Sequence, residues 1–347
     1  MKLLEFTARF TQADTEDIRR VSERYPFKIS RHYSNLIRCK EDPVWRQAVP
    51  DALELEDPSG LEDPLAEEAH SPVPNLVHRY PNRVLWIVTH ECATHCRFCT
   101  RKRRWTSPVP LTEELFQAGL DYIRRNETIR DVLVSGGDPL LLPLARLETI
   151  VSSLRRIPHV GIIRIGSRVP CVDPNRVTPD LATMLSRYHP VFVNLHFNHP
   201  IEMTAEARRA CSLLAGAGIP LGNQTVLLRD VNDRAEVLET LFQGLLAWRV
   251  RPYYLMQMDL TSGTSHFRTP LSRGLEILPA LRRRISGLAI PHFVVDLPGG
   301  RGKVPLLPSQ MLGIEESSVI LRDPAGKSCN YPLLAGEREQ LMQSMRK

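Results

Sequence analysis

Residues 84–99 read Val84-Leu85-Trp86-Ile87-Val88-Thr89-His90-Glu91-Cys92-Ala93-Thr94-His95-Cys96-Arg97-Phe98-Cys99. The run begins with apolar, partly β-branched residues and then turns polar, which predicts a short buried strand over residues 84–88. Three cysteines follow this strand directly, with the spacing C-x3-C-x2-C. A buried strand that leads into a cysteine-rich turn is therefore the starting point for the rest of the chain.

The same strand pattern recurs downstream and alternates with longer segments of helical period. We expect further strands at residues 131–134, 162–165, 191–195, 224–228, 253–256 and 293–295. We expect helices at residues 112–125, 142–156, 179–188, 205–217, 234–248 and 273–284, where apolar residues recur at three- and four-residue spacing. Strands that alternate with helices pair in parallel through right-handed crossovers. The predicted fold is therefore α/β, with a full or partial (β/α) barrel or an open doubly wound sheet.

The segments on either side of this core have a different character. Residues 1–80 read as an N-terminal helical extension, with a connector rich in Pro, Asp and Glu over residues 56–74. Residues 81–305 make up the predicted core, and residues 306–347 form a short C-terminal segment. We expect one large domain with appendages.

Composition narrows the class of protein. The chain has 347 residues, 42% of them hydrophobic, which is enough for a sizeable core. The net charge is +6, but aromatic residues make up only 6% and no stacking motif accompanies the basic runs, so anionic small ligands explain the charge as well as nucleic acid does. No apolar run approaches the roughly 18 residues of a membrane span, and the N-terminus lacks the apolar stretch of a signal peptide. We expect a cytoplasmic protein with no membrane or nucleic-acid partner.

The cysteines point to metal chemistry. The chain has seven, an odd number that makes a poor disulfide framework. Cys92, Cys96 and Cys99 offer three soft thiolates on one turn, and an iron–sulfur cluster with three protein ligands keeps one iron open for another chelator. The alternative is structural zinc, which needs four ligands and for which His95 is the nearest fourth candidate.

Further polar motifs also follow predicted strands, whose carboxyl ends meet at one edge of a barrel. These motifs are Ser135-Gly136-Gly137-Asp138, Ser167-Arg168, His196 and Asp259. Glycines would let the backbone approach a ligand, and the Asp138 carboxylate could accept a hydrogen bond from an ammonium group. A strand-to-helix turn favours glycine in any case, and His196 is equally explained as a satisfied polar residue at a strand end.

Charged residues that could bind a cofactor or substrate also lie near the ends of the predicted strands. Lys303 lies on a glycine-rich loop after the last predicted strand, where it could form a Schiff base or simply face solvent. Asp259 and Asp296 follow neighbouring strands and would suit a cationic substrate tail, although helix capping explains them too. Arg79 and Arg83 precede the first strand and would suit a phosphate, although surface arginine is commoner.

Together these residues resemble the lysine 2,3-aminomutase family of radical S-adenosylmethionine (SAM) enzymes. The likeness runs from about residue 42 to residue 322. Besides the cysteine motif and the Lys303 loop, the matching segments include Leu61-Glu62-Asp63-Pro64-Leu65, His78-Arg79-Tyr80-Pro81, Cys99-Thr100-Arg101, Arg164-Ile165-Gly166-Ser167-Arg168, His196-Phe197-Asn198-His199-Pro200 and His266-Phe267-Arg268-Thr269-Pro270. The resemblance implies a partial (β/α) barrel of the radical SAM type.

The resemblance also implies three cofactors, a [4Fe–4S] cluster, SAM and pyridoxal 5′-phosphate, and assigns residues to them. Cys92, Cys96 and Cys99 would be the cluster ligands. Lys303 would carry the pyridoxal phosphate, with Arg79 and Arg83 near its phosphate. The residues that would contact SAM are Ser135, Gly136, Gly137, Asp138, His196 and Gln224. Arg101 would hold the substrate carboxylate, and Asp259 and Asp296 would bind its distal cation.

The activity that this resemblance implies is an isomerase reaction. A 5′-deoxyadenosyl radical and a pyridoxal phosphate aldimine would move the 2-amino group of L-lysine to C3 and give β-lysine. The cluster would need an external electron donor of the flavodoxin or ferredoxin type. The alternatives are an arginine 2,3-aminomutase and a β-lysine-forming enzyme that serves elongation factor P. A different class is a noncatalytic iron–sulfur protein that binds nucleic acid.

Two departures from the family pattern change these expectations. Arg301 stands where the family loop usually has one of four consecutive glycines, which would narrow the loop or add a ligand contact. Clostridial-type members use an internal cysteine and a C-terminal cysteine group to bind zinc between subunits, whereas here only Cys329 occurs near the end. We therefore expect no structural zinc, and a homo-oligomer is a weaker expectation than for those members.

Overall fold

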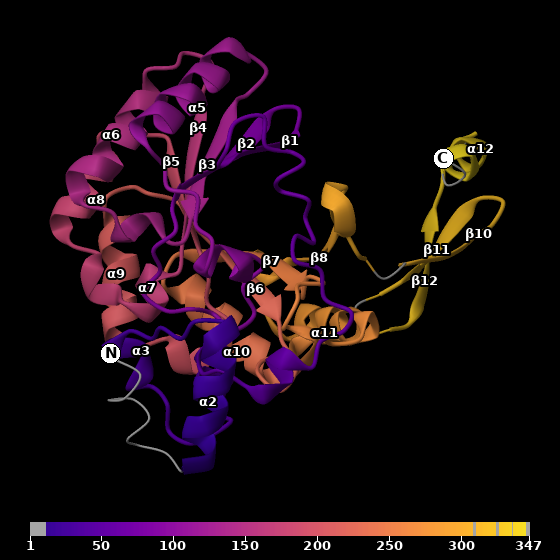
Figure 1. Cartoon of the computed structure of the whole chain (residues 1–347). Helices are drawn as coiled ribbons and strands as arrows, with labels where there is room; N and C mark the ends of the chain where they lie inside the picture. The colour runs from indigo at the N-terminus through magenta and orange to yellow at the C-terminus, as the bar shows by residue number, and fades with distance from the viewer. Residues whose placement is uncertain (1–11, 308–309, 324–325, 335, 345–347) are drawn as a thin grey trace.

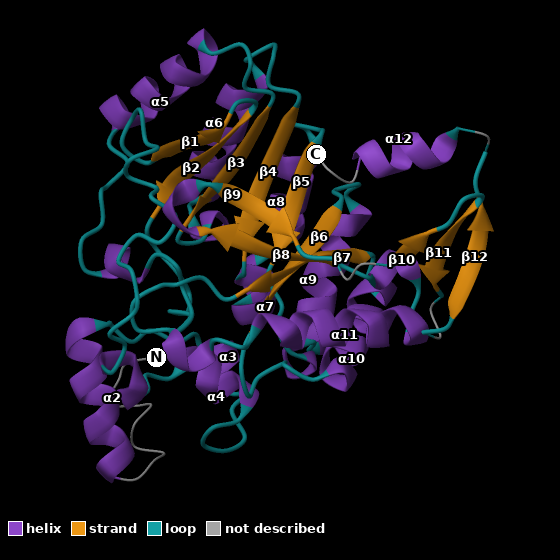
Figure 2. Cartoon of the chain, turned by 90° about the vertical axis from the view of Figure 1, so that its right-hand side faces the viewer, coloured by secondary structure: helices purple, strands orange, loops and turns teal. Residues whose placement is uncertain are grey.

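The computed structural model describes residues 12–307, 310–323, 326–334 and 336–344. Its centre is a nine-stranded sheet whose strands follow one another in chain order from β1 to β9. Strands β2 to β8 pair in parallel, whereas β1 and β9 pair antiparallel with their neighbours. The sheet curves into a partial barrel with helices on its outer side (Figures 1 and 2). The predicted partial (β/α) barrel is confirmed, and the open doubly wound alternative is wrong because the strand order never reverses.

The elements of the core lie where the hydrophobic pattern predicts them. The strands are β1 Leu76–Tyr80, β2 Arg83–Thr89, β3 Asp131–Gly136, β4 Ile162–Ser167, β5 Val191–Leu195, β6 Leu221–Leu227, β7 Val250–Gln257, β8 His292–Leu297 and β9 Gly302–Pro305. The long helices are α5 Glu113–Arg125, α6 Leu144–Arg155, α8 Pro179–Ser186, α9 Ala205–Gly216, α10 Ala235–Ala247 and α11 Leu271–Arg284. The predicted strands and helices of the core are thus all present, and they differ from the expectation only at their ends.

Helix α5 illustrates why these segments fold as they do. Thr112 caps it, because its side chain accepts a hydrogen bond from the backbone N–H of Leu115 at 3.3 Å. Its apolar residues face the sheet, where Phe116, Leu120 and Ile123 are buried. A Cβ at Gly119 would come within 3.0 Å of the Trp86 side chain on β2. Gly119 therefore lets α5 approach β2 closely, and β2 is the strand that leads into the cysteine loop.

The N-terminal segment packs against loops at the carboxyl ends of the strands. It contains α2 Gln12–Arg24, α3 Arg31–Ser34, α4 Pro43–Ala48 and the 3-10 helix η1 Ala52–Leu55. Helix α3 contacts the short helix α7 (Val169–Val172) after β4, and α4 contacts η5 (Pro200–Glu202) after β5. Asp42 caps α4 by accepting from the backbone N–H groups of Val44 and Trp45 at 2.9 and 2.8 Å.

Some strands were not predicted. Strand β1 lies in the region that we read as helix and loop, and β9 contains Lys303, which we expected on a loop. Both are short edge strands with polar residues, so their sequences lack the apolar run of a buried strand.

The C-terminal segment forms a separate three-stranded sheet, β10 Met311–Ile314, β11 Ser318–Arg322 and β12 Ser328–Pro332, followed by α12 Glu337–Ser344. This arm stands to one side of the barrel (Figure 1). None of the described helices is long and apolar enough to cross a membrane.

Candidate active site

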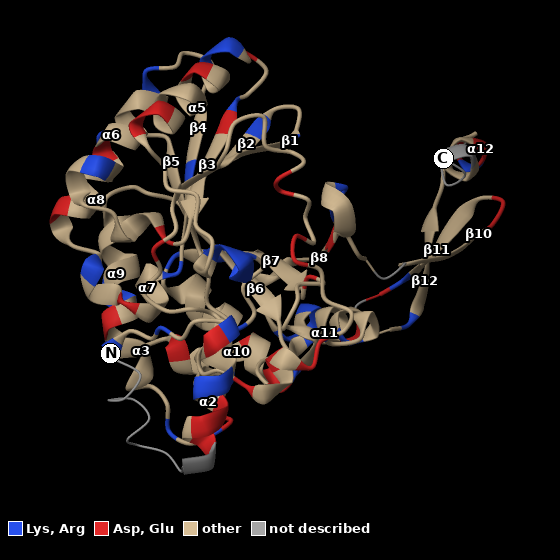
Figure 3. Ribbon diagram, in the orientation of Figure 1, with Lys and Arg blue, Asp and Glu red and all other residues tan. Residues whose placement is uncertain are grey.

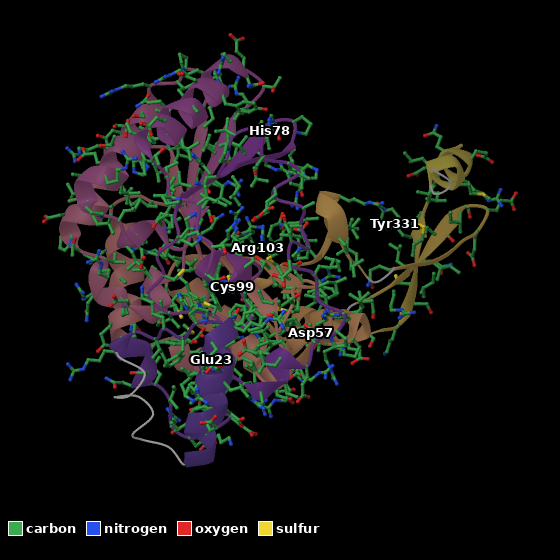
Figure 4. The ribbon with its side chains drawn as sticks, viewed as in Figure 1. Glu23, Asp57, His78, Cys99, Arg103 and Tyr331 are labelled. Carbon is green, nitrogen blue, oxygen red and sulfur yellow. The ribbon has the colours of Figure 1, made fainter. Side chains whose placement is uncertain are left out.

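The predicted site residues gather at the carboxyl end of the barrel. The cysteine loop follows β2, the Ser135–Asp138 turn ends β3, and His196 and Asp259 come just after β5 and β7. Parallel strands bring these ends to the same edge of the sheet. Cys99 and Arg103 lie near the middle of the molecule, whereas Glu23 and Tyr331 lie toward its outside (Figure 4). The barrel therefore assembles residues that are far apart in sequence.

The cysteine loop joins β2 to the 3-10 helix η2 (Lys102–Trp105). Burial, followed by the charge of Cys96, raises the pKa of the Cys99 thiol to about 11. Burial and the charges of Cys99 and Cys96 also raise the pKa of Cys92 well above its usual value. The three thiols are thus close enough to repel one another as thiolates, and a cationic iron centre would relieve that repulsion.

The fourth ligand of the zinc alternative makes other contacts. In the described part of the chain, no group of three or more His, Cys, Asp or Glu side chains is placed to hold one metal ion. An iron–sulfur cluster takes one thiolate per iron, so its ligands surround a larger object. His95, the fourth ligand in the zinc alternative, is engaged elsewhere: its Nδ1 lies 2.8 Å from the Pro26 carbonyl oxygen, and its ring stacks on Trp105 at 4.4 Å.

A buried ion-pair network anchors the loop from behind. Arg97, between two of the cysteines, is fully buried, and its Nε and Nη2 donate to the Glu54 carboxylate of η1 at 2.8 and 2.7 Å. Lys102 Nζ donates to the same carboxylate at 2.6 Å. Burial lowers the pKa of Lys102 to about 8, although the Glu54 charge opposes this shift. One acid of the N-terminal segment thus pairs with a cation within the loop and with another just beyond it.

Replacing Glu54 with alanine would leave Arg97 and Lys102 buried without their shared carboxylate. Breaking a buried ion pair on one side costs about 3–5 kcal/mol, so we expect the free energy of unfolding to fall by about that amount. Chemical denaturation followed by circular dichroism measures the change. Glu16→Ala is the control, because Glu16 is exposed and pairs with Arg19 on the surface of α2. Equal losses in the two variants would contradict the anchoring role of Glu54.

The glycine turn after β3 packs against the start of the cysteine loop. Gly136 has a φ of +137°, and a Cβ there would come within 2.1 Å of the Thr89 carbonyl oxygen. A Cβ at Gly137 would come within 2.2 Å of the Glu91 carbonyl oxygen. Glycine is therefore required at both positions, and the backbone of this turn lies directly beside the residues that precede Cys92.

Asp138 has a different environment from the one we expected. Its carboxylate accepts hydrogen bonds from Ser167 Oγ at 2.7 Å and from the backbone N–H groups of Arg168 at 2.6 Å, Val169 at 2.9 Å and Leu140 at 3.1 Å. Burial raises its pKa to about 6. These donors occupy the carboxylate from within the chain, so Asp138 ties the turn after β3 to the turn after β4. Contact with an ammonium group stays a prediction.

His196 directly follows β5, whereas Gln224 lies within β6. The Nε2 atom of His196 is buried and has no hydrogen-bond partner among the described residues. Burial, followed by the charge of Arg168, lowers its pKa to about 3, so the ring is neutral. It lies 5.5 Å from the ring of Phe98, inside the cysteine motif. Gln224 Oε1 accepts from the Tyr253 hydroxyl at 3.2 Å. A neutral imidazole with an open nitrogen beside the cysteines fits a site for a cofactor such as SAM.

Lys303 and Asp296 face each other across neighbouring strands. They are paired residues in the antiparallel β8–β9 ladder, and Lys303 Nζ donates to the Asp296 carboxylate. Arg79 lies 3.1 Å from the other oxygen of Asp296. The Tyr80 hydroxyl accepts from the Lys303 backbone N–H at 2.9 Å, and the Arg83 guanidinium stacks 3.9 Å from the Tyr80 ring. The structure therefore brings together Lys303 and both arginines that the resemblance assigns to pyridoxal phosphate.

The glycines beside Lys303 pack closely against neighbouring residues. Gly300 and Gly302 have φ values of +74° and +101°, which favour glycine, and a Cβ at Gly302 would come within 3.2 Å of the Tyr80 hydroxyl. The lysine amine, the two arginine forks and this glycine cradle fit a phosphate-bearing aldehyde cofactor. Arg301 is exposed in the turn between these two glycines.

Asp259 lies close to this group. It is buried, and burial followed by the charge of Asp296 raises its pKa to about 7. The charges of Lys303 and Arg79 act in the opposite direction. Two neighbouring acids whose charges repel each other form a site that a bound cation would stabilise. The predicted acid pair is thus assembled at the ends of β7 and β8.

Arg101 is held by an acid of the connector. Its Nε and Nη2 donate to Glu67 at 2.9 and 2.6 Å, and its Nη1 lies 3.5 Å from the Gly136 carbonyl oxygen. Arg103 of η2 pairs with Asp63 at 3.0 Å, so acids of the connector meet the basic segment in the middle of the molecule (Figure 3). One edge of the Arg101 guanidinium is therefore fixed by Glu67, and the Nη1 edge lies beside the glycine turn.

Several buried charged residues of the site have no counterpart in our predictions. Glu54, Glu67 and Glu202 are almost fully buried, and each pairs with an arginine at or near the cysteine loop. Their partners, such as Arg168 for Glu202, lie on other elements, so no local sequence pattern predicts these ion pairs. The weak signal in the sequence is Arg168 itself, which lies three residues after the end of a predicted strand.

Comparisons with known proteins agree with this geometry. Residues 86–241 match the Radical SAM superfamily, and residues 278–341 match the family described as Lysine-2,3-aminomutase. The chain is 49% identical over 325 residues to the L-lysine 2,3-aminomutase of Clostridium subterminale, which covers 92% of this chain and 78% of that protein. It is 44% identical over 337 residues to the L-lysine 2,3-aminomutase of Bacillus subtilis (95% of this chain, 71% of that protein). It is 43% identical over 320 residues to the glutamate 2,3-aminomutase of Clostridioides difficile (91% and 76%). The chain therefore belongs to the lysine 2,3-aminomutase family of radical SAM enzymes.

Proposed function

We propose that this isomerase is a lysine 2,3-aminomutase, which moves the 2-amino group of L-lysine to C3 and releases β-lysine. The observation that carries the proposal is the acid pair of Asp259 and Asp296 beside Lys303. Two carboxylates suit the cationic tail of lysine through charge-assisted hydrogen bonds. The same acids would repel the side-chain carboxylate of glutamate, so the geometry favours lysine over the substrate named for one relative.

The residues of the site divide into groups with separate tasks. When bound, the [4Fe–4S] cluster and SAM supply a carbon radical, and pyridoxal phosphate supplies a carrier for the migrating amino group. Cys92, Cys96 and Cys99 would hold the cluster. Lys303, Arg79 and Arg83 would hold pyridoxal phosphate by its aldehyde and its phosphate. The SAM site would be formed by Ser135, Gly136, Gly137, Asp138, His196 and Gln224.

Arg101 and Asp296 would bind the two ends of the amino acid. The Nη1 edge of Arg101 is the edge that Glu67 leaves open, and it would receive the substrate carboxylate. Asp296 accepts from both Lys303 and Arg79. Asp296 would be available to the substrate ammonium if Lys303 and Arg79 instead held pyridoxal phosphate. Holding both ends orients C2 and C3 and excludes water from the reacting atoms.

Further proposals concern the setting of the enzyme. We propose a cytoplasmic location and an external electron donor of the flavodoxin or ferredoxin type, because a buried cluster must be reduced from outside. The substrate is a small amino acid, and neither a membrane nor a nucleic acid is expected as a partner. A homo-oligomer stays a prediction.

A substrate panel tests the assignment. The purified protein, reduced without oxygen and supplied with SAM and pyridoxal phosphate, would be offered L-lysine, L-arginine and L-glutamate separately and in competition. We expect lysine to be isomerised fastest, because its ammonium is compact enough to contact both acids. Faster reaction with arginine would make the enzyme an arginine 2,3-aminomutase. Preference for glutamate would contradict the role of the acid pair. A β-lysine-forming enzyme that serves elongation factor P would also prefer lysine in this panel. Salt-sensitive nucleic-acid binding without isomerisation of any amino acid would indicate the noncatalytic iron–sulfur protein.

The pKa of Asp259 predicts a pH dependence for lysine use. Below a pKa of about 7 this carboxyl is protonated and neutral, and above it the carboxylate is available to the substrate ammonium. We therefore expect kcat/KM for lysine to rise with pH up to about 7, by roughly tenfold per pH unit on the acidic side. The Asp259→Asn variant should have a lower kcat/KM and lose this rise. An unchanged profile in the variant would show that another group controls the acidic limb.

A further inference from the structure

Arg168, the first residue after β4, is buried and makes polar contacts on every side. Its Nη1 donates to the Sγ atom of Cys96 at 2.8 Å, and its Nε donates to the His196 carbonyl oxygen at 3.3 Å. Its guanidinium also lies 5.1 Å from the centre of the Phe98 ring. Two of these contacts, with Cys96 and Phe98, are made inside the cysteine motif. Arg168 is therefore in direct contact with a proposed cluster ligand.

The opposite side of Arg168 is held by a set of buried partners. Its Nη2 lies within hydrogen-bond distance of Glu202 Oε1 at 2.8 Å, Gln47 Oε1 at 2.7 Å and the Tyr33 hydroxyl at 2.9 Å. Glu202 is fully buried and also accepts from the Tyr33 hydroxyl at 2.6 Å and from Gln47 Nε2 at 3.0 Å. Tyr33 and Gln47 belong to α3 and α4, so the N-terminal segment completes the surroundings of Arg168.

A buried charge in this position calls for an explanation. Burying an arginine and a glutamate costs more than their attraction returns unless the geometry is good and the remaining donors are satisfied. A hydrophobic pair of the same size would serve packing at least as well. What an apolar pair could not do is donate a hydrogen bond to a thiolate. That contact is the property of Arg168 that packing alone does not require.

We propose that Arg168 is a positioning residue for the iron–sulfur cluster, which orients the Cys96 thiolate and raises the reduction potential of the cluster. The inference rests on the proposed function, because it takes Cys96 as a cluster ligand. A reduced cluster carries one more negative charge than an oxidised one. A nearby cation and a hydrogen bond to a ligand sulfur stabilise the reduced form. Glu202 opposes this effect by its own charge while it holds the guanidinium in place.

The proposal makes predictions of opposite sign for two variants. In Arg168→Gln combined with Glu202→Gln, the charged pair is replaced by two neutral amides, and the midpoint potential should become more negative. In Glu202→Gln alone, the charge of Arg168 loses its compensation, and the potential should become more positive. Arg187→Gln, at the exposed end of α8, removes a surface charge and is the matched control. Its potential should equal that of the unmodified protein.

The measurement is a redox titration of the anaerobically reconstituted full chain with mediator dyes, followed by electron paramagnetic resonance of the reduced cluster. Iron and sulfide are determined on each sample first. If the unmodified protein binds no [4Fe–4S] cluster, the proposed function is wrong. If the cluster is present and the potentials of both variants equal that of the control, the inference about Arg168 is wrong. Should the double variant fail to fold, Glu202→Gln alone decides, because a potential that is unchanged or more negative would overturn the proposal.

Discussion

Replacing Lys303 with alanine is expected to abolish both the covalent attachment of pyridoxal phosphate and all turnover. An aldehyde cofactor needs an amine held close to its binding site, and Lys303 Nζ is held by Asp296 across the β8–β9 ladder. The flanking arginines would still attract the phosphate, so weak reversible binding would remain. Reduction with borohydride followed by peptide mass analysis detects the covalent adduct, and product analysis detects turnover.

The Lys40→Ala variant is the control for this experiment. Lys40 is an exposed lysine that pairs with Asp14 of α2, far along the chain from the β8–β9 ladder. It should keep both the adduct on Lys303 and full activity. A Lys303→Ala protein that still forms β-lysine at the normal rate would refute the assignment of the amine.

Replacing Cys99 with alanine should have an equally large effect at an earlier stage. The loop would hold the cluster with three thiolates and this variant leaves only two, so iron and sulfide content should fall. SAM cleavage should become undetectable with or without an amino acid present. Anaerobic reconstitution, iron and sulfide analysis, and chromatography of 5′-deoxyadenosine measure these losses.

Two exposed cysteines outside the loop provide the comparison. Cys39 and Cys329 are both exposed. Cys39→Ala and Cys329→Ala should retain full cluster content and full SAM cleavage. If either lowered the iron content as much as Cys99→Ala does, the C-x3-C-x2-C assignment would be incomplete.

Much of the fold could be predicted because the central strands are short apolar runs with polar ends. Strands such as β3 and β5 bury alternate residues, which are valine or leucine, and apolar residues at this spacing are typical of a strand. Strands β1 and β9 lie at the edges and carry polar residues, so Lys303 was expected on a loop. Its cross-strand pairing with Asp296 depends on a register that no local pattern encodes.

The candidate site could be predicted at the level of residue types at strand ends. What could not be predicted is how its charges pair. Arg168 and Glu202 are 34 residues apart in sequence, and Arg97 and Glu54 are 43 apart, so only the assembled fold brings them together. Asp138 shows the same limit, because its four donors come from the turns after β3 and β4.

The proposed reaction moves the 2-amino nitrogen of lysine from C2 to C3. The most direct test uses L-lysine labelled with ¹⁵N at the 2-amino group and ¹³C at C3, incubated without oxygen with the reduced, fully loaded enzyme. We expect a β-lysine in which ¹³C is bonded directly to ¹⁵N, seen as a one-bond coupling in the nuclear magnetic resonance spectrum. SAM should not be consumed in proportion to product. Unchanged lysine alongside active SAM cleavage, or a product without that coupling, would contradict the proposed reaction.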